Sequence, residues 1–463
     1  MSATLSQDAL TALKDALRQA IEKGDGDAAW DLLVPHEAAL GRDLEVTRIW
    51  LDLLRLTPQK PTLEAEVELA TAGFADRPEV IIAGNAALLA RAARRAPDEP
   101  PLRDDGPAHK AAKAAEACLA RLSEAERNDP RIGGYLYGNL ANALRLAGPK
   151  YDKESHAAFY KALEIAPDRG DLWHDLGLLH KWRGRWENAY AAFLKARARL
   201  GETRPVLFNL AIAATGIGDG DVAAGTLKQL GMPVELGPDG KLPFVPGLPP
   251  AQVRVLSRGA GYVTASAFPN EATAFEVLWV QPLSPFHGVV ASPCFRDAPI
   301  DYGDVIMFDP APVSQSRDAD GNLVPCFPIL EVLRRGDEHR MRFIAYVERE
   351  DAFEAFSRGL PEGFTLFRQS ERIESARPSI FTGEKLEKPV APLSPKLAHG
   401  KIVAPANADL TALEAYLEAS PFAKKELAFA IPALYEKLGK TKRAGQEHQA
   451  YRGIERKVER RAG

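Results

Sequence analysis

The stretch DLWHDLGLLHKWRGRWENAYAAFLKA, residues 171–196, constrains the fold more than any other part of the chain. Apolar and small residues recur at three- and four-residue intervals on both sides of Gly184, which is typical of two amphipathic helices joined by a tight turn. Trp173 lies on the buried face of the first helix, and Gly177 is small enough for a second backbone to cross closely. Phe193 on the second helix fills the remaining gap. The spacing therefore predicts a helix–turn–helix unit whose aromatic side chains are core residues.

The same pattern continues on both sides of this unit. One unit later, Leu207 takes the position of Trp173, and Gly218 takes the position of the turn glycine. One unit earlier, Tyr137 and Gly148 take these two positions, and a two-residue insertion precedes the second helix. Three units in register are about the minimum that allows stacked helix pairs to bury a continuous core.

These three units resemble tetratricopeptide repeats (TPR), a family of helix–turn–helix units of about 34 residues. The resemblance implies a superhelix whose concave groove holds a peptide or a partner protein. It places the following side chains in the groove: Tyr135, Asn142, Arg145, His174, Lys181, Trp182 and Phe208. Trp182 is the most suggestive of them, because a partly exposed tryptophan is a common binding anchor. Its alternative role is contact with the next repeat or with the β-rich segment that follows.

Some members of this family grip a C-terminal carboxylate with lysine and asparagine side chains. In this chain Gly138 and Pro205 stand where those lysines would be, and Asp175 stands where one asparagine would be. Of these positions, Asn142 alone fits, so the sequence does not favour that class of ligand. A groove that mixes basic and aromatic side chains could instead hold an acidic or aromatic segment.

Changes in periodicity and composition divide the chain into five segments. Residues 1–125 show worn helical periodicity and are expected to form divergent helix pairs, and residues 126–231 carry the TPR-like repeats. Residues 232–384 contain six to eight short β-type runs separated by turn signals, which predicts a small β-barrel or sandwich. A Pro-rich linker is expected at 385–408 and a helical, basic tail at 409–463. The predicted fold is a multidomain α + β protein with an N-terminal helical superhelix, a β domain and a short helical C-terminal segment.

Composition narrows the class of protein further. The net charge of −4 and the isoelectric point near 6.2 argue against wholesale nucleic-acid binding. Three cysteines are too few for a disulfide framework and suggest a reducing compartment. The sequence contains neither the apolar stretch of a signal peptide nor an apolar run of about 18 residues. We therefore expect a cytoplasmic protein without a membrane span.

The β-rich segment contains the densest group of residues that could perform chemistry. A nucleophilic pair or a zinc site can be drawn from His287 and Cys294, but the sequence has no CxxC, HxxxH or HExxH spacing. The motif SRDADGN holds Asp318, Asp320 and Asn322, yet it lacks the glycine and the closing glutamate of a calcium loop, which favours a hairpin turn. We predict no catalytic residue, metal ligand or cofactor. An enzyme with an active site near His287 remains an alternative function.

The C-terminal tail supplies a third hypothesis. From Lys437 to Arg461 the chain has nine basic and three acidic residues, a local excess of six positive charges. Such a segment could bind a nucleic acid or an acidic partner. The sequence favours a solvated terminal helix with ion pairs four residues apart, and Tyr451 is the one aromatic residue there. The first hypothesis is thus an adaptor that binds a protein or peptide, with enzyme and nucleic-acid-associated protein as alternatives.

Overall fold

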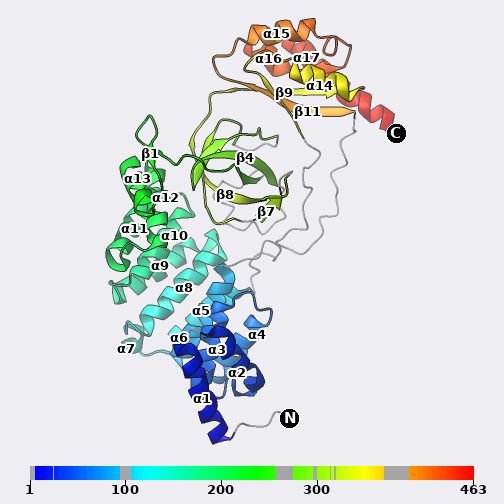
Figure 1. Cartoon of the computed structure of the whole chain (residues 1–463). Coiled ribbons are helices and arrows are strands. Elements are labelled where there is room, and N and C mark those ends of the chain that lie inside the picture. The colour runs from blue at the N-terminus through cyan, green and yellow to red at the C-terminus, as the bar shows by residue number, and fades with distance from the viewer. Residues whose placement is uncertain are drawn as a thin grey trace.

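The structure is a computed structural model that describes residues 6–23, 25–93, 106–256, 275–295, 300–312, 314–317, 320–369 and 396–462. Figure 1 shows three parts in chain order: a long array of helices, a β-barrel, and an α/β unit that contains the C-terminus. The prediction of an N-terminal helical region followed by a small barrel is confirmed at this level. Within the described ranges, no helix is both long enough and apolar enough to cross a membrane.

The first half of the array contains helices of uneven length. They are α1 (Gln7–Glu22), α2 (Gly26–Leu33), the 3₁₀ helix η1 (Val34–Ala39), α3 (Leu44–Leu56), α4 (Leu63–Gly73), α5 (Pro78–Ala93), α6 (Pro107–Arg121) and α7 (Glu124–Arg127). Asp43 begins α3, because its side chain accepts hydrogen bonds from the backbone N–H groups of Glu45 and Val46. The core of this half surrounds Trp50, whose buried indole donates a 2.6 Å hydrogen bond to Glu66.

The second half contains three helix pairs in the order that the spacing predicts. They are α8 (Gly133–Ala147) with α9 (Asp152–Ile165), α10 (Gly170–Lys181) with α11 (Trp186–Leu200), and α12 (Arg204–Ile217) with α13 (Gly220–Gln229), and the 3₁₀ helix η2 (Pro149–Tyr151) lies between the first two. The two helices of each pair pack against each other. Gly184 and Gly218 adopt φ values of +63° and +76° in the turns, which is the left-handed region that favours glycine.

Packing within the α10–α11 pair follows the predicted spacing. A Cβ atom at Gly177 would lie 2.5 Å from the ring of Phe193, so only glycine permits this approach of the two helices. Phe193, Ala189 and Ala196 are completely buried. Trp173 is only partly buried, and its indole donates a hydrogen bond to the carbonyl of Pro167.

The β region forms a closed barrel. Its strands are β3 (Ala251–Leu256), β4 (Phe275–Ser284), β5 (His287–Val290), β6 (Val305–Phe308) and β8 (Leu323–Arg334), preceded by the small hairpin β1 (Glu235–Leu236) and β2 (Pro243–Phe244). Successive strands pair antiparallel, and β8 closes the barrel by pairing parallel with β3. The strand β7 (Ser314–Arg317) extends the sheet by a hairpin in which Arg317 faces Leu323, so the turn predicted at SRDADGN is confirmed. Asp318 and the β-type run GYVTA lie outside the described residues.

The C-terminal part is an α/β unit with its own sheet. Its strands are β9 (His339–Tyr346), β10 (Thr365–Arg368), β11 (Leu397–Ala404) and β12 (Phe429–Ala430), and its helices are α14 (Glu350–Arg358), α15 (Leu410–Ala419), α16 (Pro432–Lys437) and α17 (Thr441–Ala462). The central strands β9 and β11 pair antiparallel along their whole length. This sheet crosses the boundary drawn at residue 384 in the sequence. The expectation that 397–404 is part of an extended linker is wrong. This segment is a largely buried strand, because its apolar residues share one hydrophobic core with those of β9.

The barrel packs on the last helices of the array. Trp186, Ile212 and Leu227 from the helices share one hydrophobic cluster with Phe286, Met307 and Leu330 from the barrel. The rings of Phe208 and Phe286 meet edge-on, with their centroids 5.8 Å apart. One part of the helical surface is therefore occupied by the protein's own β-barrel.

Candidate functional site

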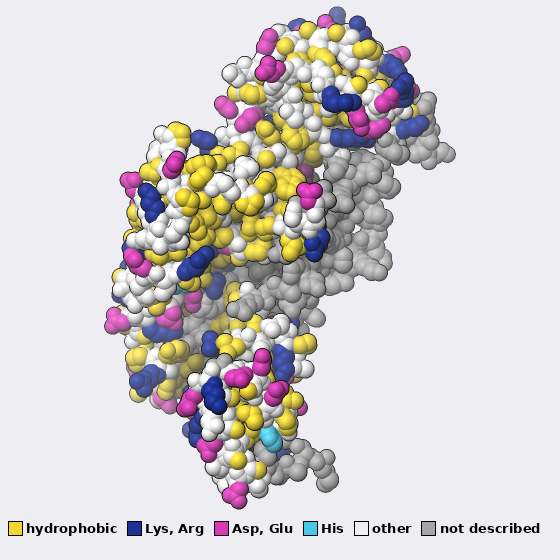
Figure 2. Space-filling view, viewed as in Figure 1, with side chains coloured by type: hydrophobic (Ala, Val, Ile, Leu, Met, Phe, Trp, Pro, Cys, Tyr) yellow, Lys and Arg dark blue, Asp and Glu magenta, His cyan; other side chains and the backbone are white. Residues whose placement is uncertain are grey.

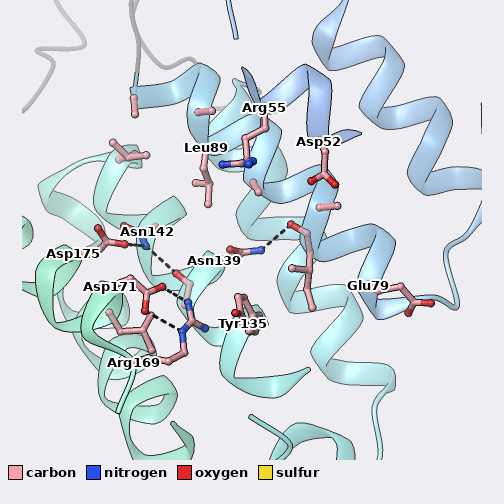
Figure 3. A pocket seen from close by; sticks show the side chains of 18 of the residues that line it. Asp52, Arg55, Glu79, Leu89, Tyr135, Asn139, Asn142, Arg169, Asp171 and Asp175 are labelled. Carbon is pink, nitrogen blue, oxygen red and sulfur yellow. Dashed lines mark hydrogen bonds and ion pairs between the residues drawn. The ribbon is translucent and has the colours of Figure 1, made fainter. Parts of the chain in front are cut away.

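A cavity of about 710 Å³ lies on the face that alternate helices of the array share (Figure 3). Helices α3, α5, α8 and α10 line it, which are the first helices of successive pairs. Its exposed lining side chains include Arg48, Arg55 and Tyr135, so it opens to solvent. It is distinct from the part of the array that the barrel covers.

On each helix, the side chains that line the cavity are spaced three or four residues apart, so they lie on one face of that helix. On α8, Tyr135, Asn139 and Asn142 follow at intervals of four and three residues and point to the same side. On α5, small and apolar side chains do the same, and they form an apolar wall: Ile82, Ala83, Ala86, Leu89 and Ala90. Asn139 Nδ2 donates a 3.2 Å hydrogen bond to the carbonyl of Ile82, which fixes α8 against α5. The cavity thus combines an apolar wall with a polar one.

Close helix packing shapes the floor. A Cβ atom at Gly138 would lie 2.8 Å from a methyl group of Leu172, so α8 and α10 approach each other tightly below the cavity. Gly138 therefore serves helix packing.

A chain of polar contacts runs from the cavity along the array. Arg145 donates to Asn142 Oδ1 from Nε (3.2 Å) and Nη2 (2.9 Å), and Asn142 Nδ2 donates to Asp175 Oδ2 (2.7 Å). His174 Nδ1 lies 3.6 Å from the other oxygen of Asp175. The Nε2 atom of His174 lies 3.2 Å from Asn209 Nδ2, which carries the chain onto α12.

This series of polar contacts ends at the barrel. Lys181 Nζ donates to Asn209 Oδ1 (2.9 Å) and forms an ion pair with Asp309 Oδ2 (2.7 Å). The side chains of Lys181 and Asp309 are only 5% and 4% exposed, so this ion pair is buried between α10 and the loop after β6. A continuous set of side-chain contacts therefore links the cavity to the junction between helices and barrel.

The charges beside the cavity perturb each other. Burial raises the pKa of Asp175, but the hydrogen bond from His174, the charge of Arg145 and the hydrogen bond from Asn142 together outweigh it, so the pKa of Asp175 is below its usual value. Burial lowers the pKa of Arg145, and Asp175 counteracts this effect in part. Both groups are charged at neutral pH, with Asn142 between them.

The opposite end of the cavity carries an aromatic side chain. Tyr135 is 42% exposed, and the guanidinium of Arg169 lies 3.8 Å from the centroid of its ring. Arg169 Nε also donates to Asp171 Oδ1 at 3.1 Å. Figure 3 shows Tyr135, Arg169 and Asp171 gathered at one end, with Arg55 and Leu89 at the other.

The structure divides the side chains that the sequence assigned to a groove. Tyr135, Asn142 and Arg145 line the cavity, and His174 lies in the polar chain beside it. The other three lie at the junction with the barrel: Lys181, Trp182 and Phe208. Lys181 is paired with Asp309, and Trp182 and Phe208 pack against the mixed cluster of helix and barrel residues. The alternative role considered for Trp182 matches its position.

The sequence did not identify the contributions of α3 and α5. Arg48, Asp52 and Arg55 lie four and three residues apart on α3, opposite the buried stripe that contains Trp50. That polar stripe was a usable signal. The register of the first helix pairs was too worn to show that it faces the same side as Tyr135.

The proposed enzyme site is not supported by the geometry around His287. This side chain is completely buried, and its Nδ1 atom lies 2.5 Å from Ser284 Oγ. Burial lowers the pKa of His287 to about 4. Cys294 is buried too, and its thiol lies 3.3 Å from a carboxylate oxygen of Glu276. Among the described residues, no group of three His, Cys, Asp or Glu side chains is placed to hold a metal ion.

The basic tail is folded onto the C-terminal unit. Ile454 of α17 is completely buried in a small cluster with Ile344 and Tyr346 of β9. Arg443 pairs with Glu447 four residues later at 3.0 Å, as expected for a helix that stabilises itself with ion pairs. One face of this helix is thus used for packing. The side chains from residue 457 onward lie outside the described set.

Comparison with known proteins adds no assignment. A scan against protein-family models finds no match to this chain, and a search of curated proteins finds no similar sequence. The site is therefore interpreted from its own residues.

Proposed function

We propose that this protein is a scaffold or adaptor, and that its helical array is a tetratricopeptide-like superhelix that binds a peptide or partner protein on the face shared by α3, α5, α8 and α10. The observation that carries the proposal is the open cavity of about 710 Å³ on that face. Tyr135, Asn142 and Arg145, which the resemblance to tetratricopeptide repeats places in a groove, all line it.

The chemistry of the cavity suits a polypeptide ligand. The wall formed by α5 offers small apolar side chains, whereas α8 offers amide and guanidinium groups that can bind backbone and side-chain oxygens. A surface with one apolar and one polar side is typical of grooves that hold a peptide with matching sides. On the visible face of the array, acidic and basic side chains are mixed rather than separated, so no field of one sign excludes a folded partner (Figure 2).

The proposal is tested by selecting, from a displayed library of short peptides, those that bind the intact protein. Ala86 lies on the apolar wall of the cavity, and Ala86→Trp would fill the space that a ligand needs. We expect this variant to lose affinity for the selected peptides by at least about tenfold, because the ligand side chains would be displaced from the apolar wall. Affinity is measured by fluorescence anisotropy with purified chain and labelled peptide.

Ala117→Trp is the matched control. Ala117 is an exposed residue of α6, which contributes nothing to the cavity lining, so the same substitution there leaves binding unchanged. Selected peptides that bind both variants equally well would refute a role for this face.

A further inference from the structure

Building on the proposed function of this groove, we propose that its ligand is an acidic segment of a partner protein, with one carboxylate bound by the guanidinium of Arg145. The inference names the chemistry of the partner. It rests on three observations about which charges in the groove are already neutralised.

Arg145 is a half-buried cation without a carboxylate partner. Its Nε and Nη2 atoms both donate to the single oxygen of Asn142, and no carboxylate oxygen of the described residues lies within ion-pair distance. A guanidinium has five N–H donors in a planar fork that fits a carboxylate with two parallel hydrogen bonds. The donors that Asn142 leaves unused are therefore available to a ligand from the cavity side.

Two of the four carboxylates that line the groove already have partners. Asp171 pairs with Arg169, and Asp175 accepts from Asn142. By contrast, three arginines on the lining have no ion-pair partner among the described residues: Arg48, Arg55 and Arg131. All three are exposed, so they act at the rim, where they attract an acidic segment before it docks.

The remaining acidic groups argue for a peptide rather than a nucleic acid. Asp52 lies between Arg48 and Arg55 on α3, and Glu79 lies at the start of α5. These carboxylates would repel a continuous row of phosphates, whereas a peptide can place acidic side chains at intervals. The apolar wall of α5 and the exposed ring of Tyr135 would contact apolar or aromatic side chains between them. An amphipathic acidic segment satisfies both sides.

The experiment compares a selected groove-binding peptide with a version in which each Glu and Asp is replaced by Gln or Asn. We expect the neutral peptide to bind at least about tenfold more weakly, since a hydrogen bond between two charged groups is stronger than one to a neutral amide. Arg145→Gln should weaken the acidic peptide by a similar factor and hardly affect the neutral one. This coupling is the double-mutant signature of a direct pair, which a structural role of Arg145 would not produce.

Further variants test the contribution of the exposed arginines at the rim and of the positive charge at residue 145. Arg48→Glu should weaken the acidic peptide and reduce the salt dependence of its binding. Arg42→Glu, an equal charge change at an exposed residue that does not line the cavity, should have a much smaller effect. Arg145→Lys keeps the charge and should retain part of the affinity lost in Arg145→Gln, and circular dichroism checks that each variant is folded.

The outcomes separate this inference from the proposed function. Neutral or basic peptides that bind the chain and are blocked by Ala86→Trp would overturn the acidic ligand but leave the adaptor role in place. An oligothymidine probe that binds and is blocked by the same variant would also overturn it, because the arginines would then contact phosphates. If no selected peptide depends on the groove, both proposals fail together.

Discussion

Replacement of Asp309 by asparagine would leave the ammonium group of Lys181 buried without a counter-charge. Removing one partner of a buried ion pair costs about 3–5 kcal/mol. Here Lys181 keeps its hydrogen bond to Asn209 Oδ1 and its position 5.0 Å from the centroid of the Trp182 ring, so part of its charge remains stabilised. We therefore expect the lower end of that range, about 3 kcal/mol, which is roughly a hundredfold in the unfolding equilibrium of the junction.

Denaturant titration followed by tryptophan fluorescence measures this loss. Trp182 and Trp186 lie in the cluster between helices and barrel, so the share of the emission that comes from these two of the six tryptophans reports on the junction. Asp351→Asn is the matched control, because Asp351 belongs to an exposed ion pair with Arg349, and solvent screens such pairs, so its loss should hardly change the stability.

A double replacement distinguishes charge burial from simple damage. Lys181→Met combined with Asp309→Leu removes both charges and leaves apolar groups, which is often neutral or stabilising in a buried site. We expect the double variant to be more stable than Asp309→Asn. An Asp309→Asn variant that loses less than about 1 kcal/mol would show that the ammonium finds other solvation, and the reasoning about this junction would be incorrect.

Two other predictions concern helix packing and pH. Gly177→Ala should destabilise the array by about 1–3 kcal/mol in denaturant titration, because the new Cβ atom would overlap the ring of Phe193. Gly225→Ala on α13 is the control: no atom lies within 4 Å of its added Cβ, so it should stabilise the array by about 0.5–1 kcal/mol. Equal effects of the two substitutions would contradict the close crossing of α10 and α11. The buried side chains of His180 and His287 each have a pKa lowered from 6.5 to about 4, mainly by burial, so the unfolded chain binds protons that the folded chain excludes between these values. Stability should therefore decrease as the pH falls from about 6.5 to about 4 and should not change from this cause above that range. His180→Gln should reduce this slope.

Local spacing predicted the parts of the structure that depend on neighbouring helices. The pattern around Gly177 and Phe193 specifies one helix pair, and related spacing about 34 residues away indicated the neighbouring pairs. Short β-type runs between turn signals similarly indicated the barrel strands, for example β6 and β8. These features are encoded by residues close together in the chain, so a single sequence is sufficient to find them.

Long-range contacts could not be predicted in the same way. Lys181 and Asp309 are 128 residues apart, and nothing in either local pattern indicates that they pair. The strand β11 was missed because prolines precede it, and its partner β9 comes before the segment that was expected to be a linker. Similarly, Arg48 and Arg55 belong to the groove only because α3 packs beside α5, which the weak periodicity of the first 125 residues does not specify.

The division of the helical face between barrel and cavity has a physical basis in the side chains along it. At the end near α12 the exposed surface would be strongly apolar, with Trp182, Phe208 and Ile212 close together, and such a surface is stabilised by permanent burial against the barrel. Toward α3 the lining becomes mixed, and the arginines there retain solvent contact. The polar chain from Arg145 to Asp309 joins these two regions, so a ligand carboxylate at Arg145 would act on Asn142 and Asp175, the first members of that chain. One gradient of side-chain polarity along the array therefore accounts for the permanent intramolecular contact at one end and for the reversible binding that we propose at the other.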